Sequence, residues 1–238
     1  MVGTPGSGTR VFARLAEAAG RDMGAHQTEA NDAWALYHLA SKWCKRVYPA
    51  WASGEALDYS EFESDLKPHM EAHRSEADPA APWGWKQPRS LYLLPAWNAV
   101  FPDLLVIHVI RDGRDVPFSS QPNVRLSGRY TLPASAEGEP EEVKAAMVWD
   151  GPNRLAADFG EQELGDRYLR LSLEEVCAAP EATAGRLVSL LDGTRIEPHR
   201  LDSIVETPAS LGRWRHEDPE LVARIAAAAA GLRRFGYT

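Results

Sequence analysis

The chain has 238 residues, of which 44% are hydrophobic, and a formal net charge of −8. This length fits one α/β domain with a sizeable core, and we expect a single domain over residues 1–238. The acidic balance argues against a general nucleic-acid binder, so we expect no nucleic-acid partner.

Two cysteines, Cys44 and Cys177, match no metal-binding or redox spacing, which is typical of reduced thiols in the cytoplasm. No apolar run approaches the roughly 20 residues that a membrane span needs. No charged and then apolar leader precedes the first motif. We therefore expect a cytoplasmic protein without a membrane span, of undetermined oligomeric state.

The first motif is a glycine-rich stretch, Gly3-Thr4-Pro5-Gly6-Ser7-Gly8-Thr9-Arg10. Such a turn at a helix start leaves backbone N–H groups free for an oxyanion, and the helix N-terminus adds partial positive charge. Gly3 and Gly8 have the Walker spacing, but Thr9 replaces the Walker lysine. We expect a loop for phosphate-like groups rather than for a triphosphate; a plain helix-capping turn is the alternative. Because only two residues precede the loop, the first strand is expected to be very short or incomplete.

The remaining elements follow from hydrophobic periodicity. Helical spacing predicts helices near residues 11–19, 29–47, 59–72, 91–100, 117–120, 141–159, 182–191 and 219–232. A continuous apolar run predicts a buried strand at 104–110, and alternation predicts another at 168–173. Strands that alternate with helices predict an α/β fold, a parallel sheet flanked by helices on both faces in a P-loop-like three-layer sandwich.

A helical segment of about residues 26–85 contains five of the eight tryptophans. They are Trp34, Trp43, Trp51, Trp83 and Trp85. They predict either a satellite core or an aromatic acceptor pocket beside the glycine loop, and both readings stay open. Residues 121–140 are rich in turn formers and predict a mobile lid.

The second motif begins at the end of the strand at 106–110. Arg111 follows this strand, and Ser119 lies eight residues later. A guanidinium at the end of a buried strand is a fixed donor for a phosphate dianion, and a serine hydroxyl adds another donor. The neighbours Asp112, Arg114 and Asp115 are expected to form a charged surface rim with structural roles.

Together the two motifs resemble the sulfotransferases that use 3′-phosphoadenosine-5′-phosphosulfate (PAPS). In that family the loop holds the 5′-phosphosulfate, and the strand-end Arg and the Ser hold the 3′-phosphate. Lys86 before Pro88 is similar to the family's lysine-bearing strand, 173–180 to its Tyr-Glu-Asp stretch, and 210–215 to the loop that closes over the nucleotide. The resemblance implies these PAPS-binding residues: Pro5, Gly6, Ser7, Gly8, Thr9, Arg10, Arg111, Ser119, Arg213 and Trp214.

The resemblance implies sulfuryl transfer to an acceptor hydroxyl, or less readily an amine, of a small molecule or glycan. Adenosine 3′,5′-bisphosphate would be released, with Arg10 and Lys86 stabilising the leaving oxygen. The sequence offers no acidic cluster for Mg²⁺, so no metal is expected. Two alternatives stay open: a P-loop nucleotide or small-molecule kinase, and a catalytically inactive PAPS-binding regulator.

Many members of the family place a histidine as general base at the position where this chain has Pro88. The base of this chain is therefore expected at another position. The segment after the first helix, residues 26–32, is the best source. We expect Glu29 to be the base, with His26 second and Asp32 third. Glu29 is also expected to begin the next helix, where a carboxylate would interact with the helix dipole.

Overall fold

The fold is that of a computed structural model, which describes residues 1–24, 26–75, 78, 80–119, 128 and 130–238. Its central sheet is parallel: β1 (Val106–Ile110) pairs with β2 (Tyr168–Ser172), from Val106 opposite Tyr168 to Ile110 opposite Ser172. On the other side of β1, Val2 forms a parallel bridge with His108. Beyond Val2, Gln87 donates from its backbone N to Met1 O at 3.3 Å. The predicted parallel arrangement is confirmed, although its strands are short.

Helices and short 3₁₀ or π segments (η) make up the other regular elements of the described residues. In chain order they are α1 (Thr9–Ala18), η1 (Trp34–Leu36), α2 (Tyr37–Ser53), α3 (Ser60–His73), η2 (Pro88–Leu93), α4 (Leu94–Val100), η3 (Ala134–Ala136), α6 (Glu141–Phe159), η4 (Gly160–Leu164), η5 (Gly165–Arg167), α7 (Leu173–Ala178), α8 (Pro180–Leu191), α9 (Pro198–Ile204), η6 (Arg213–His216), α10 (Pro219–Ala228) and α11 (Gly231–Arg234).

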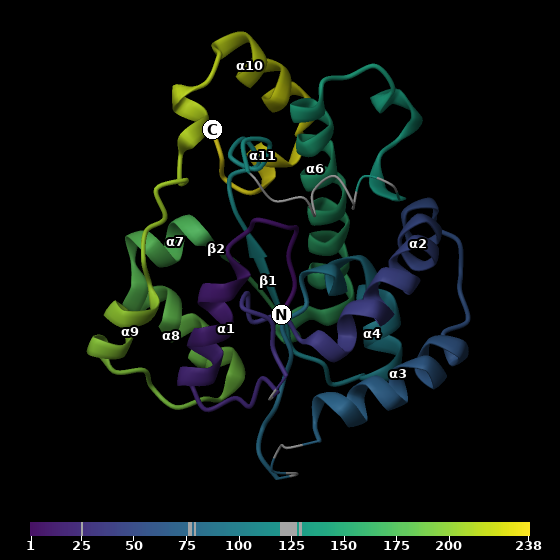
Figure 1. The fold of residues 1–238 in the computed structure, drawn as a ribbon, viewed down its shortest axis with the longest axis vertical. Helices are drawn as coiled ribbons and strands as arrows, with labels where there is room; N and C mark the ends of the chain where they lie inside the picture. The colour runs from purple at the N-terminus through teal and green to yellow at the C-terminus, as the bar shows by residue number, and fades with distance from the viewer. Residues whose placement is uncertain (25, 76–77, 79, 120–127, 129) are drawn as a thin grey trace.

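Alternating side chains of β1 hold the layers together. Ile107 and Val109 join the cluster that contains the buried faces of α1 and α8, whereas Val106 joins one with η2, α4 and α6. Figure 1 accordingly shows α1 and α8 on one side of the strands and α4 and α6 on the other. The predicted flanking of the sheet on both faces is thus confirmed. A separate cluster of aromatic side chains fills the space between α2, α3 and α4.

The helix predicted at 29–47 is wrong at its start. Residues 28–31 form a turn, because the Thr28 hydroxyl accepts from Ala30 N (3.2 Å) and Asp32 N (3.1 Å), and Asn31 adopts a left-handed φ of 59°. Short polar side chains that bond nearby backbone compete with helix in this way. The α-helix begins only at Tyr37 and continues to Ser53.

Three further segments differ from the sequence pattern. The helix predicted at 117–120 is a turn in its described part, residues 117–119, and the helix predicted at 91–100 is a 3₁₀ segment up to Leu93. The helix predicted at 219–232 ends at Ala228 and resumes at Gly231. The lid predicted at 121–140 lies partly outside the described residues; its described part includes the short η3.

Candidate functional site

The glycine loop joins Val2 to α1 and leaves its backbone open on one side. Gly6 and Gly8 have left-handed φ values of 88° and 85°, and Ser7 N donates to Thr4 O at 3.2 Å. At Gly8 a Cβ would lie 2.8 Å from Leu173 Cδ1, so glycine is needed on both grounds. Within the described part of the chain no side chain caps α1. Val11 N donates to Gly8 O at 3.2 Å, so the N–H groups that precede it at the start of this helix are the ones suited to an anion.

A chain of buried hydrogen bonds supports the loop from below. Tyr168 Oη lies 2.7 Å from His108 Nδ1, and His108 Nε2 lies 2.9 Å from Asn153 Oδ1. Asn153 Nδ2 then donates to Thr4 Oγ1 at 3.4 Å, and Thr4 Oγ1 lies 2.9 Å from Ser7 Oγ. Because the Asn153 oxygen accepts, His108 carries its proton on Nε2 and accepts from Tyr168 on Nδ1. Burial lowers the pKa of His108 to about 4, which keeps this imidazole neutral.

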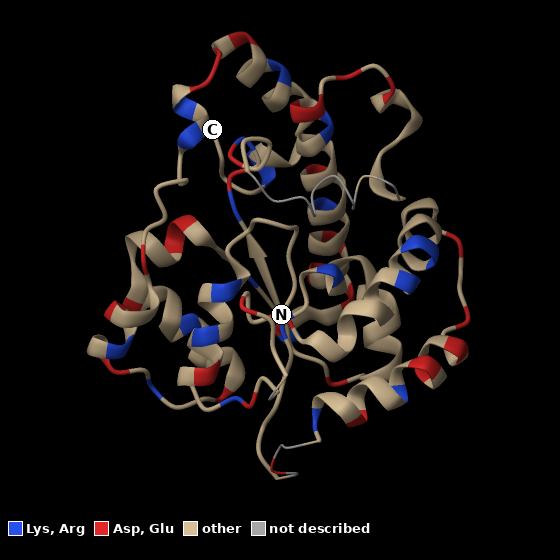
Figure 2. Cartoon of the chain, viewed as in Figure 1, with Lys and Arg blue, Asp and Glu red and all other residues tan. Residues whose placement is uncertain are grey.

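A cavity of about 750 Å³ opens above the loop. Its lining includes nine residues predicted for the site, namely Pro5, Gly6, Gly8, Thr9, Arg10, Lys86, Arg111, Ser119 and Arg213. Basic and acidic residues are interspersed over the outer helices (Figure 2), but among the described residues the lining contains six cations and only two carboxylates, Asp32 and Glu206. A positive cavity on an acidic chain is suited to a polyanionic ligand.

Lys86 enters the cavity from the extended segment beside Met1 and is only 3% exposed. Its Nζ donates to Ala30 O at 2.6 Å and forms an ion pair with the Asp32 carboxylate. Burial lowers the pKa of Lys86, and the charge of Arg10 lowers it further, whereas Asp32 opposes the shift. Lys86 and Arg10 both line the cavity.

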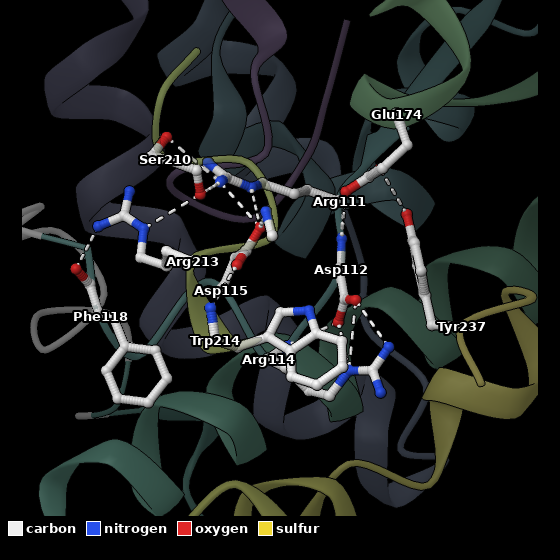
Figure 3. Close-up of polar contacts among 11 residues, drawn as sticks. Arg111, Asp112, Arg114, Asp115, Phe118, Glu174, Ser210, Arg213, Trp214 and Tyr237 are labelled. Atoms are coloured by element: carbon white, nitrogen blue, oxygen red, sulfur yellow. Dashed lines mark hydrogen bonds and ion pairs between the residues drawn. The ribbon is translucent and has the colours of Figure 1, made fainter. Parts of the chain in front are cut away.

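Arg111 lies at the carboxyl end of β1 with its guanidinium held on one side (Figure 3). Its Nη2 donates to Asp115 Oδ2 at 2.9 Å, to Ser210 Oγ at 3.2 Å and to the Ser210 carbonyl. Nε donates to the same Asp115 oxygen at 3.3 Å. In the described part of the chain, Nη1 donates to no protein atom, so its two N–H groups are available to a ligand in the cavity.

The segment at 210–214 brings a second guanidinium to this point. Arg213 lines the cavity, and its side chain donates to Ser210 O at 3.2 Å and to the Phe118 carbonyl. Trp214 is absent from the cavity lining, and the Arg114 guanidinium lies 3.8 Å from its ring centroid (Figure 3).

Comparisons with known proteins identify the family of this chain. The sequence matches a family described as the sulfotransferase family over residues 1–197. The chain belongs to the sulfotransferase family. A search of the curated proteins finds no match.

Two solved structures share the fold of this sulfotransferase. Sulfotransferase STF9 from Mycobacterium avium aligns over 100% of this chain and 76% of its own, with a TM-score of 0.57 and 15% identity. A sulfotransferase domain from the curacin biosynthetic pathway aligns over 98% of this chain and 96% of its own, with a TM-score of 0.56 and 14% identity. At this identity the likeness concerns the fold.

Not all the predicted site residues of the sulfotransferase meet in the cavity. Ser7 is buried in the loop, where its hydroxyl bonds Thr4. His26 and Glu29 are exposed and lie outside the lining, whereas Asp32, third in our order, lines the cavity beside Lys86.

The aromatic acceptor pocket predicted beside the loop is wrong, because none of the five tryptophans lines this cavity. Trp43 is buried in the aromatic core, Trp51 packs against it, and Trp34 is 54% exposed. Trp83 and Trp85 line a second cavity of about 440 Å³, together with Phe101 and Met23.

The prediction of a charged surface rim after Arg111 is also wrong. Asp112, Arg114 and Asp115 are buried, and Arg114 Nη2 bonds Asp112 Oδ2 at 2.8 Å. Charged side chains are tolerated in the interior when they are paired, and the sequence alone does not show which partners they have. Sequence reasoning also missed Arg14, which lines the cavity one helical turn after Arg10; the i, i+4 spacing of the two arginines was the available signal.

None of the helices in the described part of the sulfotransferase combines the length and hydropathy that a membrane-spanning segment needs. In the same residues, no group of three or more His, Cys, Asp or Glu side chains is arranged to hold a metal ion.

Proposed function

We propose that this sulfotransferase moves a sulfuryl group from PAPS to an acceptor hydroxyl, or less readily an amine, and releases adenosine 3′,5′-bisphosphate. One observation carries the proposal: a single cavity joins the glycine loop, Lys86, Arg111 and Ser119. These parts come from three separate stretches of the sequence, and each has the chemistry that one group of the donor needs.

The residues of the cavity fit a nucleotide with two anionic groups. At Gly6 a Cβ would lie 3.8 Å from Ser119 Oγ, so the bare glycine leaves space between the loop and the second motif. Gln87 lines the cavity, and its buried Nε2 has no partner within the described residues. A buried donor without a partner is costly, and a bound oxyanion would satisfy it.

Each part of the donor has its own group of residues. The loop from Pro5 to Arg10 would hold the 5′-phosphosulfate through its N–H groups and the start of α1. Arg111, Ser119 and Arg213 would hold the 3′-phosphate by charge-assisted hydrogen bonds. Apolar side chains that line the same cavity would contact the adenine. These are Val11, Leu173, Ile204 and Pro208.

The donor supplies an activated sulfuryl group, and the protein supplies position, charge and a base. The oxygen of the acceptor hydroxyl would bond to sulfur while the bond from sulfur to the 5′-phosphate oxygen breaks. Asp32 would accept the proton that this hydroxyl loses. Lys86 and Arg10 would stabilise the negative charge on that leaving oxygen. Asp32 takes the place of Glu29 and His26 in this proposal, because it alone of the three lines the cavity.

The acceptor side of the cavity is mainly polar. It is lined by Ala30, Asp32, Tyr37 and residues 86–89. Arg89 lies with its guanidinium 4.9 Å from the Tyr37 ring centroid and bonds Ser41 Oγ. This lining suits a small hydroxyl-bearing molecule or a glycan. A cytoplasmic location and transfer without a metal remain parts of the proposal.

Calorimetric titration with adenosine 3′,5′-bisphosphate and with adenosine 5′-monophosphate tests the proposed function. The bisphosphate should bind more tightly, because Arg111 and Ser119 interact only with the 3′-phosphate. Arg111→Ala should remove on the order of 2 kcal/mol of that preference. Equal affinity of the wild-type protein for the two nucleotides would contradict the assignment. An increase in Tm with Mg²⁺ and ATP, but not with the bisphosphate, would favour the kinase alternative.

A further inference from the structure

Asp115 joins two parts of the nucleotide site that are distant in sequence. Its side chain is 0% exposed, and one oxygen, Oδ2, accepts from the Arg111 guanidinium at 2.9 Å. The same oxygen accepts from Gly212 N at 2.7 Å, and the other oxygen, Oδ1, accepts from Trp214 N at 3.2 Å. One carboxylate therefore fixes both an arginine side chain and the backbone of the segment at 210–214 (Figure 3).

The consequence for Arg111 is orientation. Asp115 and Ser210 occupy Nε and Nη2, so the free edge of the guanidinium at Nη1 is the one that is available to a ligand. A planar guanidinium that is fixed on one edge presents the other in a defined direction. A free side chain would lose rotamer entropy when it bound a phosphate, and this contact reduces that cost.

The consequence for the 210–214 segment is position. Arg213 lies between Gly212 and Trp214, whose backbone N–H groups both bond Asp115. Gly212 has a left-handed φ of 71°, which turns the chain at this point. The two bonds place the Arg213 side chain in the cavity next to Ser210, where Arg111 also bonds.

We propose that Asp115 is a positioning residue for the 3′-phosphate: it holds Arg111 and Arg213 in the geometry that distinguishes a 3′-phosphorylated nucleotide from one without that group. The proposal rests on the proposed function, because it assumes that the cavity takes such a nucleotide. Among the described residues, the Asp115 carboxylate bonds Arg111 and the 210–214 backbone, and Asp115 is absent from the cavity lining, so its action is indirect.

The experiment compares Asp115→Asn with Asp150→Asn. Asp150 is a matched control: a buried carboxylate that accepts from Gly231 N at 2.5 Å and from Arg154 Nε at 2.9 Å, away from the cavity. Calorimetry gives the ratio of the affinities for adenosine 3′,5′-bisphosphate and adenosine 5′-monophosphate. In Asp115→Asn we expect that ratio to fall about tenfold or more, with monophosphate affinity within about threefold. In Asp150→Asn the ratio should not change, even where Tm falls.

A further variant tests whether Asp115 acts through Arg111. In an Arg111→Ala background, Asp115→Asn should lower the ratio much less than it does in the wild-type protein. An unchanged ratio in Asp115→Asn, an equal fall in Asp150→Asn, or a full additional fall in the Arg111→Ala background would overturn the inference. A wild-type ratio near one would instead contradict the proposed function.

Hydrogen exchange on the wild-type protein provides a test if Asp115→Asn fails to fold. The amides of Gly212 and Trp214 should become more protected with the bisphosphate than with the monophosphate, since ligand at Arg111 stabilises the shared carboxylate. Equal protection with the two nucleotides would overturn the inference.

Discussion

The two sides of the cavity are built in different ways. The proposed donor side combines two contiguous motifs, at residues 5–10 and 111–119, with the segment at 204–213, which bonds Arg111 and Asp115 across 97 to 99 residues of sequence. The proposed acceptor side, with Ala30, Asp32, Tyr37 and residues 86–89, depends on a long-range ion pair between Asp32 and Lys86 and on a turn fixed by Thr28. The difference shows why motifs identify the glycine loop, Arg111 and Ser119, whereas the position of Asp32 in the cavity depends on tertiary structure.

The largest effect should come from the acceptor side. Asp32→Asn should lower turnover by roughly 10² or more, since an amide cannot take the proton of the acceptor. Nucleotide affinity should stay within about threefold, because Asp32 lies outside the donor side. Steady-state kinetics with PAPS and calorimetry with adenosine 3′,5′-bisphosphate measure the two quantities.

Glu29→Gln is the matched control, since Glu29 is exposed and lies three residues away. Its turnover should remain within about twofold of the wild-type value. If Glu29→Gln abolishes turnover and Asp32→Asn does not, the base is Glu29, and the turn at 28–31 must move when the acceptor binds.

The contrast also marks how far the sequence could be interpreted. The strand at 106–110 and the loop at 3–10 were predictable because local chemistry decides them: a continuous apolar run, and glycines with positive φ. The placement of Glu29 was not, because a single hydroxyl, Thr28 Oγ1, converts an expected helix start into a turn. Nor was the burial of Asp115, whose carboxylate accepts from Arg111 nearby but also from Gly212 N and Trp214 N, 97 and 99 residues along the chain.

The next effect concerns His108, in the hydrogen-bond chain that supports the glycine loop. Burial lowers the pKa of His108 to about 4 from an ordinary 6.5. As pH falls below 6.5, the unfolded chain takes up a proton that the folded protein does not accept until about pH 4, so stability falls across this window. The contribution of His108 to the free energy of unfolding that is lost across this window is on the order of 3 kcal/mol.

His108→Gln should remove most of that pH dependence, because glutamine has no titrating group but keeps a donor and an acceptor for Asn153 and Tyr168. Urea unfolding at several pH values between 4 and 7 measures it. Identical slopes for variant and wild type would show that His108 is not the source, and the hydrogen-bond chain under the loop would then need another account.

Lys86 connects the two sides, and its effect should be seen in the alkaline part of the rate profile. Burial lowers the pKa of Lys86 below the ordinary 10.5, so its charge is lost at a lower pH than in an exposed lysine. Turnover should therefore decline as pH rises, with a midpoint below 10.5. Lys86→Arg should be slower near neutral pH but lack this decline, since a guanidinium stays charged. The same alkaline decline in both proteins would assign it to another group.

The smallest effect should come from Trp34, a surface residue that packs against the cavity-lining Tyr37. Trp34 is 54% exposed and stacks on Tyr37, with ring centroids 5.7 Å apart and an interplanar angle of 15°. Trp34→Ala should reduce the free energy of unfolding by about 1 kcal/mol or less, the value of one aromatic pair at a surface. Trp43→Ala, in the fully buried core, should cost about 3–5 kcal/mol.

Because Tyr37 lines the cavity and Trp34 supports its ring, Trp34→Ala should raise the KM for the acceptor severalfold while the Kd for adenosine 3′,5′-bisphosphate stays unchanged. A loss of nucleotide affinity in Trp34→Ala would show that the two sides are not independent.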